Sequence, residues 1–250
     1  MNKFFGYILS ILHYLYFLLV LIVFQPIQWL SLKLGGYTAH KHSVDILNAF
    51  LISTYYVLGC RVSFSDEQHV PTGRPIIFVA NHQSMYDIPP LIWFLRKYHA
   101  KFISKIELTK GIPSISFNLK HGGGANIDRK DSKQSIVEIA GLGTRMKKNN
   151  WSAVIFPEGT RSKTGAVKTF HVGGIATLLK KAPNALIVPI AIENSWKMNK
   201  YGKFPLSPFH HLKFTVLPSI EPANKPIEEV VLFAENEIRS FVEKTNLYNF

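Results

Sequence analysis

The sequence predicts an α/β fold in which one domain follows a pair of apolar helices. Beyond about residue 60, short apolar runs typical of buried strands alternate with longer helical stretches, which is the pattern of an α/β domain. We expect strands over residues 75–80, 101–104, 125–128, 151–156, 186–192 and 213–220, and helices over residues 88–98, 132–148, 172–181 and 227–244. Residues 61–250 have the size of a single domain, and we assign residues 1–60 to a membrane-anchoring segment.

The first helix of the pair is expected to bind a membrane. Residues 4–24 carry no formal charge, and an apolar helix of about twenty residues can cross a bilayer core of ~30 Å. We expect Pro26 to end this helix. A cleaved signal peptide is the alternative, but the apolar run is too long, Lys3 is its only preceding basic residue, and no small-x-small cleavage site follows. A second, shorter helix over residues 44–60 carries Asp45, which suits the membrane interface better than a full crossing.

The composition favours a protein that works at a membrane surface. The net charge is +13 and the pI about 9.7, while 47% of the residues are hydrophobic. A basic chain with an apolar anchor suits an anionic lipid surface better than nucleic acid, so we expect no nucleic-acid partner. Lys33 and Lys41 after the first helix outnumber Lys3 before it, which by the positive-inside rule favours a domain on the cytoplasmic face.

A candidate base and a candidate carboxylate follow the strand predicted at residues 75–80. His82 and Asp87 lie five residues apart, and on a regular helix their side chains would point about 140° away from each other. We therefore expect His82 in a loop, a helix that begins near Ser84, and Asp87 in its first turn, turned back toward the imidazole. In the alternative interpretation, Ser84 and Asp87 form a capping box and the carboxylate serves only backbone N–H groups.

A candidate anion site follows the strand predicted at residues 151–156. Pro157 and Gly159 indicate a turn, and Arg161 lies at the strand's exit. Because ligands of open α/β sheets bind outside the carboxyl ends of strands, we expect this loop and the His82 loop to face one crevice. An arginine there can bind phosphate with two parallel hydrogen bonds. The alternative is a salt bridge between Glu158 and Arg161.

Four sequence blocks occur in a fixed order over about half of the chain. Asn81 begins N-H-x-x-x-x-D, Arg129 ends G-A-N-I-D-R, Phe156 begins F-P-E-G-T-R, and V-P-I-A covers residues 188–191. In this order and spacing the blocks resemble the signature of the glycerolipid acyltransferase family. Lys105 lies in a lysine-x-Glu-Leu segment that is similar to a phosphate-binding segment of that family.

The resemblance implies a fold and a reaction. The implied fold is an α/β domain with a mixed sheet, preceded by two helices that dip into one leaflet. The implied reaction moves a fatty acyl group from acyl-CoA or acyl carrier protein to the sn-2 hydroxyl of 1-acylglycerol-3-phosphate, which gives phosphatidate. The expected partners are the membrane lipid, the lyso-lipid acceptor and the acyl donor, with no cofactor.

The resemblance also implies roles for individual residues. His82 would take the proton from the acceptor hydroxyl, and Asp87 would hold the imidazole in the correct tautomer. N–H groups at the start of the following helix are candidate donors to the thioester oxygen. The residues expected to position the acceptor's phosphate and glycerol are Lys105, Arg129, Glu158, Gly159, Thr160 and Arg161.

Other functions explain less of the sequence. An acyltransferase for a different lyso-lipid, such as a lysophospholipid or an amino-acid lipid, remains open. A non-catalytic protein that binds anionic membranes would leave the four ordered blocks without a purpose. The sequence shows neither the G-x-S-x-G of serine hydrolases nor a P-loop. Cys60 is the only cysteine and the histidines are scattered, so we expect no metal site.

Overall fold

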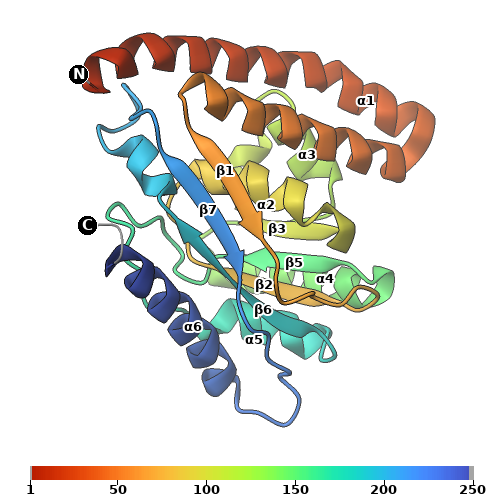
Figure 1. Ribbon diagram of the computed structural model, residues 1–250. Coiled ribbons are helices and arrows are strands. Elements are labelled where there is room, and N and C mark those ends of the chain that lie inside the picture. Colours follow the sequence, from red (N-terminus) through yellow and green to blue (C-terminus); the bar gives the residue numbers. More distant parts are fainter. Residues whose placement is uncertain (1, 248–250) are drawn as a thin grey trace.

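Helices cover both faces of one seven-stranded sheet in the computed structural model, which describes residues 2–247 (Figure 1). The strands are β1 (Arg61–Ser65), β2 (Ile76–Ala80), β3 (Ala100–Lys105), β4 (Ala125–Ile127), β5 (Ser152–Ile155), β6 (Leu186–Glu193) and β7 (His211–Val216). Their order in the sheet is β1-β7-β6-β2-β5-β3-β4. The five strands from β6 to β4 run parallel, whereas β7 is antiparallel to β6, so the predicted α/β fold with a mixed sheet is confirmed.

The helices connect these strands. The α-helices are α1 (Asn2–Val57), α2 (Ile88–Phe94), α3 (Ile115–His121), α4 (Ser132–Asn149), α5 (Val172–Lys181) and α6 (Ile227–Leu247). Within residues 2–247, four short 3-10 helices lie in loops, namely η1 (Met85–Asp87), η2 (Arg96–Tyr98), η3 (Ile106–Thr109) and η4 (Ser195–Asn199).

Alternate residues of the central strands build two separate cores. Successive side chains of a strand point to opposite faces of the sheet. On β2, Ile77 and Val79 pack in the core beneath α4, α5 and α6, whereas Ile76, Phe78 and Ala80 pack beneath α2 and the end of α1. All five are fully buried. The central strand is thus fixed from both faces, and so is the point at which its chain leaves the sheet.

The anchoring segment is a helical hairpin, α1, laid across one end of the domain (Figure 1). Its two arms join at Gly36, where the backbone leaves the helix (φ 65°, ψ −160°). The expectation that Pro26 ends the first arm was wrong, because Pro26 lies inside the helix. The turn falls instead at Gly36, where the absence of a Cβ atom allows positive φ. The second arm consequently begins well before residue 44.

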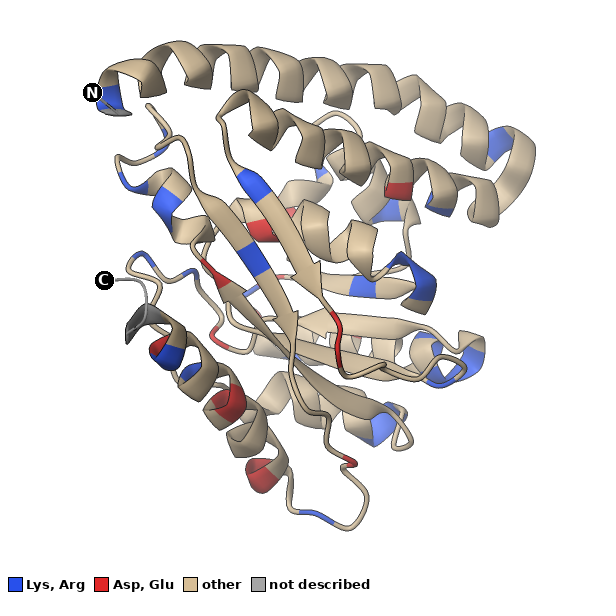
Figure 2. Ribbon diagram, in the orientation of Figure 1, with Lys and Arg blue, Asp and Glu red and all other residues tan. Residues whose placement is uncertain are grey.

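One side of the hairpin packs against the protein and the other side is bare. Between the arms, Val20, Leu21 and Phe24 meet Leu47 and Leu51. The first arm carries no charged side chain over residues 4–32, which Figure 2 shows as a continuous tan length of ribbon. By length and composition α1 can cross a membrane. Its exposed apolar side chains include Phe4, Ile8, Ile11, Leu12, Leu15, Leu18, Leu19, Ile22, Leu30 and Leu34.

The hairpin is attached to the α/β domain through specific contacts. The Ser10 hydroxyl accepts a hydrogen bond from the backbone N–H of Leu206 over 2.8 Å. On the second arm, the ring of Tyr37 stacks on Trp151 with centroids 5.2 Å apart. These contacts fix how the hairpin lies relative to the sheet.

Apart from short 3-10 helices, one strand and one α-helix had no counterpart among the expectations. The edge strand β1 alternates Val62 and Phe64 with polar residues and is only partly buried, so it lacks the apolar run by which buried strands are recognised. The seven-residue helix α3 is too short for a helical period to show. The last strand ends at Val216 and not at residue 220, because Pro218 follows it.

Candidate active site

The predicted site residues lie along one edge of the sheet. β2, β5, β3 and β4 are parallel neighbours in this order, so their carboxyl ends form a row. His82 follows β2, the 158–161 loop follows β5, Lys105 ends β3, and Arg129 follows β4. The sheet topology therefore brings together four segments that lie far apart in the sequence.

His82 and Asp87 are in direct contact. Nδ1 of His82 lies 2.8 Å from Oδ2 of Asp87. His82 is 8% exposed, whereas Asp87 is fully buried. The structure places His82 in the loop before η1 and Asp87 in its first turn, as predicted from their spacing.

The capping box is also present, and it uses the same carboxylate. Oδ2 of Asp87 accepts hydrogen bonds from the backbone N–H groups of Gln83 (2.8 Å) and Ser84 (2.9 Å). In return, the hydroxyl of Ser84 accepts from the N–H of Tyr86. The two interpretations of Ser84 and Asp87 therefore do not exclude each other: the cap holds the carboxylate in the position where it meets the imidazole.

Two neighbours of opposite character fix the tautomer of His82. An ionised carboxylate only accepts hydrogen bonds, so Nδ1 carries the proton that faces Asp87. A guanidinium only donates, and Nε of Arg161 lies 3.4 Å from Nε2 of His82. Nε2 thus presents its lone pair on the side of the ring where the exposed Arg161 lies. This is the atom that can accept a proton from a substrate.

The loop after β5 holds the backbone of His82 from both sides. Oε1 of Glu158 accepts a hydrogen bond from the His82 N–H over 3.0 Å, and the N–H of Ser162 donates to the His82 carbonyl over 2.7 Å. The His82 ring stacks on Phe156 with centroids 4.0 Å apart. On the other flank, the Asn81 amide makes two hydrogen bonds to the backbone of Ile192 on β6. The position of the imidazole is therefore set by three strands.

Glu158 is a buried carboxyl group with one satisfied oxygen. It is 4% exposed, and within residues 2–247 its Oε2 atom has no hydrogen-bond partner. Burial raises its pKa to about 7, because the loss of hydration outweighs the hydrogen bond from the His82 N–H and the nearby Lys168. Glu158 contacts the backbone of His82 and forms no salt bridge with Arg161 within the described chain. Its predicted contact with substrate stays a prediction.

Of the remaining predicted site residues, Gly159 is partly buried and the others are exposed. Gly159 has φ of 68°, a conformation that favours glycine. The hydroxyl of Thr160 accepts a hydrogen bond from Lys168, whose ammonium also donates to the Arg161 carbonyl. Lys105 and Arg129 are exposed at the ends of neighbouring strands. Their roles toward a phosphate stay predictions.

The capping box engages several backbone N–H groups at the start of the helix after His82. The N–H groups of Gln83 and Ser84 donate to Asp87, and those of Tyr86 and Asp87 donate to Ser84. These four groups are therefore engaged within the loop, and a donor to the thioester oxygen from the start of this helix stays a prediction. Arg161 is a donor beside Nε2 that remains open: its Nη1 and Nη2 atoms have no hydrogen-bond acceptor among residues 2–247.

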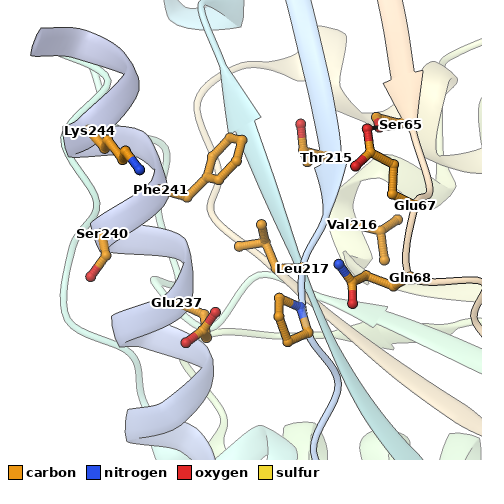
Figure 3. Close-up of a pocket in the computed structure, with 11 residues that line it drawn as sticks. Ser65, Glu67, Gln68, Thr215, Val216, Leu217, Glu237, Ser240, Phe241 and Lys244 are labelled. Atoms are coloured by element: carbon orange, nitrogen blue, oxygen red, sulfur yellow. Dashed lines mark hydrogen bonds between the residues drawn. The ribbon is translucent and has the colours of Figure 1, made fainter. Parts of the chain in front are cut away.

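A separate hollow of about 540 Å³ lies between α6 and the strands β1 and β7 (Figure 3). Glu67, Glu237 and Lys244 are among its lining residues, and none of the predicted site residues belongs to it. Its walls lack a base paired with a carboxylate. The arrangement of polar groups, and not the size of a cavity, identifies the candidate site at the carboxyl edge of β2 and β5.

Comparison with known proteins agrees with this arrangement. A family model described as acyltransferase matches residues 61–193, which is more than half of the chain. The chain belongs to the acyltransferase family. The region that the acyltransferase model matches includes His82, Asp87 and the 158–161 loop.

Curated relatives and a solved structure carry related names. The human 1-acyl-sn-glycerol-3-phosphate acyltransferase beta is 31% identical over 159 residues, covering 64% of this acyltransferase and 55% of the human protein. A chloroplastic 1-acyl-sn-glycerol-3-phosphate acyltransferase of Arabidopsis thaliana is 29% identical over 143 residues, covering 57% and 38%. The chain thus spans about half the length of these relatives, or less. The crystal structure of the 1-acyl-sn-glycerophosphate acyltransferase PlsC from Thermotoga maritima superposes with a TM-score of 0.81, 21% identity and 98% coverage of both chains, which shows a shared fold.

Two residues of the site were not anticipated. Lys168 supports the 158–161 loop, and the hydroxyl of Ser195 donates a hydrogen bond to Oδ1 of Asp87. Ser195 is 108 residues from Asp87 in the sequence. Neither lies in one of the four blocks, and no local pattern distinguishes them from other lysines and serines.

Proposed function

We propose that the protein transfers a fatty acyl group from a thioester donor, acyl-CoA or acyl carrier protein, to the sn-2 hydroxyl of 1-acylglycerol-3-phosphate. The observation that carries this proposal is the contact of His82 with Asp87, which leaves Nε2 unprotonated on the side of Arg161. The names of the curated relatives support the choice of acceptor.

The reaction needs one base and no covalent enzyme intermediate. Nε2 of His82 takes the proton of the acceptor hydroxyl while the hydroxyl oxygen attacks the thioester carbonyl. Asp87 stabilises the imidazolium that forms. The carbon–sulfur bond then breaks, the new ester forms, and the imidazolium returns its proton to the leaving thiolate. A guanidinium beside Nε2 can stabilise charge on the carbonyl oxygen or on the acceptor's phosphate.

The acceptor's phosphate is assigned to the basic row at the carboxyl edge of β5, β3 and β4. Arg161, Lys105 and Arg129 lie at the ends of these neighbouring strands and are exposed. In 1-acylglycerol-3-phosphate the carbon that bears the phosphate is next to the carbon that bears the reacting hydroxyl. A phosphate held by Arg161 therefore brings that hydroxyl toward Nε2 of His82.

The hairpin α1 is proposed to anchor this domain in one leaflet on the cytoplasmic face. One side of the hairpin is covered by α2 and α3 while the other exposes apolar side chains, so only the bare side can meet lipid. Such a one-sided element lies in the interface and does not cross the bilayer. Lys33 and Lys41 near the turn favour the cytoplasmic side.

The loop after η4 extends the same surface. Tyr7 of α1 contacts Phe204 with ring centroids 5.4 Å apart, and Phe204 is 49% exposed. The ammonium groups of Lys3 and Lys200 lie 5.7 Å and 5.9 Å from the centroid of the Tyr201 ring. Aromatic rings mixed with lysines are typical of a contact with lipid headgroups.

The test is an assay of the purified protein with acyl-CoA and acyl carrier protein donors. The acceptors are 1-acylglycerol-3-phosphate and the monoacylglycerol with the same chain, together with lysophospholipids. We expect a kcat/KM at least tenfold higher for the phosphate-bearing acceptor. Equal values for the pair would contradict phosphate recognition, and a preferred lysophospholipid would assign the site to a different acceptor.

A further inference from the structure

The second oxygen of Asp87 has a partner that neither the base nor the helix cap accounts for. Oδ2 accepts from His82, Gln83 and Ser84, whereas Oδ1 accepts a hydrogen bond from the hydroxyl of Ser195. Ser195 is fully buried at the beginning of η4. It lies just beyond residues 61–193, the region shared with the acyltransferase family model.

The direction of this hydrogen bond is fixed by chemistry. A carboxylate only accepts, so the Ser195 hydroxyl is the donor. The amide oxygen of Gln83 lies 3.3 Å from the same hydroxyl, but one hydroxyl has one proton, and a charged carboxylate is a stronger acceptor than an amide oxygen. A buried carboxylate oxygen without a hydrogen-bond donor is costly, and the Ser195 hydroxyl supplies that donor to Oδ1.

The scaffold around Ser195 holds the hydroxyl in place. The Asn81 amide hydrogen-bonds to both the N–H and the carbonyl of Ile192, which ties the end of β6 to the loop that carries His82. Asn194 then adopts φ of 68° and turns the chain into η4. From η4, Asn199 accepts a hydrogen bond from the Ser84 hydroxyl over 2.8 Å. η4 therefore contacts the cap and the carboxylate of the dyad at the same time.

We propose that Ser195 is a positioning residue for acyl transfer, whose hydroxyl holds the Asp87 carboxylate oriented toward Nδ1 of His82. The inference rests on the proposed function, since it names a further part of the same site. Ser195 touches neither substrate, and it acts only through Asp87. Its loss should therefore lower kcat and leave the KM values for donor and acceptor unchanged.

The kinetic test compares three substitutions with a matched control. Ser195→Ala should lower kcat about tenfold or more, because a hydrogen bond to a charged group is lost. Ser195→Cys, which keeps the shape with a weaker donor, should also be impaired, whereas Ser195→Thr keeps the hydroxyl and should retain most activity. The control is Ser207→Ala: Ser207 is another buried serine of the same region, bonded to His210, and its loss should leave kcat unchanged. Thermal unfolding checks that each variant is folded.

A double-variant comparison separates positioning from general structural support. In an Asp87→Asn background, Ser195→Ala should cost less than about twofold in kcat, because residues that act as a unit are not additive. Full additivity, or a KM effect without a kcat effect, would overturn the proposal. Wild-type turnover measured alongside tests the proposed reaction itself.

A spectroscopic measurement makes the proposal independent of the substrate. The Nδ1–H proton of His82, assigned by its absence in His82→Ala, should change its NMR chemical shift in Ser195→Ala and not in Ser207→Ala. This holds even if no tested lyso-lipid is acylated. An unchanged resonance together with wild-type kcat in Ser195→Ala would rule out the assigned role.

Discussion

Oδ2 of Asp87 lies 2.8 Å from Nδ1 of His82 and also receives the N–H groups that cap η1. The same carboxylate oxygen therefore both orients the imidazole and caps the helix. A helix cap contributes ~1 kcal/mol to stability. The folding of the loop itself therefore helps to keep the carboxylate where the imidazole needs it.

Asp87→Asn should lower kcat by ~10²- to 10⁴-fold, about as much as His82→Ala. The partners of the Asp87 carboxylate all donate hydrogen bonds to it, whereas the amide of asparagine has one oxygen that accepts and one NH2 group that donates. An NH2 group facing Nδ1 of His82 would favour the tautomer with the proton on Nε2, which cannot act as the base. Asp131→Asn is the matched control, because Asp131 caps α4 by accepting from the Gln134 N–H and lies outside the site. Steady-state kinetics of the purified variants measure the difference. A similar loss of kcat in both variants would mean that Asp87 serves only as a helix cap.

Arg161→Lys should raise the KM for 1-acylglycerol-3-phosphate more than that for the thioester donor. Lysine keeps the charge but cannot make the two parallel hydrogen bonds of a guanidinium. Arg161→Ala should raise this KM further, and both variants should lose most of the preference for the phosphorylated acceptor over monoacylglycerol. Lys163→Ala, a change of an exposed lysine in the same loop, serves as the control. A loss of kcat alone would assign Arg161 to the carbonyl oxygen and not to the phosphate.

The local part of the site was predictable from the sequence. The five-residue spacing of His82 and Asp87 is incompatible with one helix face, and it forced the loop and the first turn that the structure shows. Apolar runs located the central strands within one or two residues, because a strand that is buried on both faces is a nearly continuous run of apolar residues.

The parts that depend on distant segments were not predictable. Ser195 meets Asp87 only because β6 lies beside β2, and a serine after a strand has no distinctive pattern. The availability of N–H groups for an oxyanion also depended on the capping box, whose contacts with Asp87 the sequence allowed but did not require. The prediction that Pro26 ends the first helix failed for a different reason: the helix continues through Pro26, where Phe24 packs against Phe50 of the second arm.

Leu15→Glu combined with Leu19→Glu should release the protein from membranes. Both side chains are on the bare side of the first arm, 61% and 56% exposed, so the fold should tolerate the change. An acidic side chain in the apolar part of a bilayer costs ~2.5–3.5 kcal/mol on insertion scales. The control is Leu232→Glu on α6, which is 55% exposed and distant from the hairpin. Sedimentation with membranes in high salt, at unchanged Tm, gives the readout, and full retention of the double variant would argue against the hairpin as the anchor.

Glu158→Gln should change how stability depends on pH. The pKa of Glu158 is about 7 in the folded protein and 4.5 without the fold, so the folded state binds a proton that the unfolded state releases between these values. The free energy of unfolding should therefore fall as pH rises from 4.5 to 7 and level off above, by ~3 kcal/mol at most. The glutamine side chain does not titrate, and its oxygen can still accept the hydrogen bond from the His82 N–H. The free energy of unfolding of Glu158→Gln, relative to that of the wild type, should therefore increase as pH rises from 4.5 to 7.

The comparison of slopes makes this prediction testable even if the amide lowers stability overall. Glutamine places an N–H group where Oε2 has no partner, and the cost of that group is the same at every pH. Chemical unfolding in detergent at pH 5 and pH 8 should therefore give a smaller difference for Glu158→Gln than for the wild type. Glu229→Gln, which changes an exposed carboxylate on α6, should behave as the wild type does. Equal differences for wild type and Glu158→Gln would mean that Glu158 is charged in the folded protein, with a cation or water on Oε2.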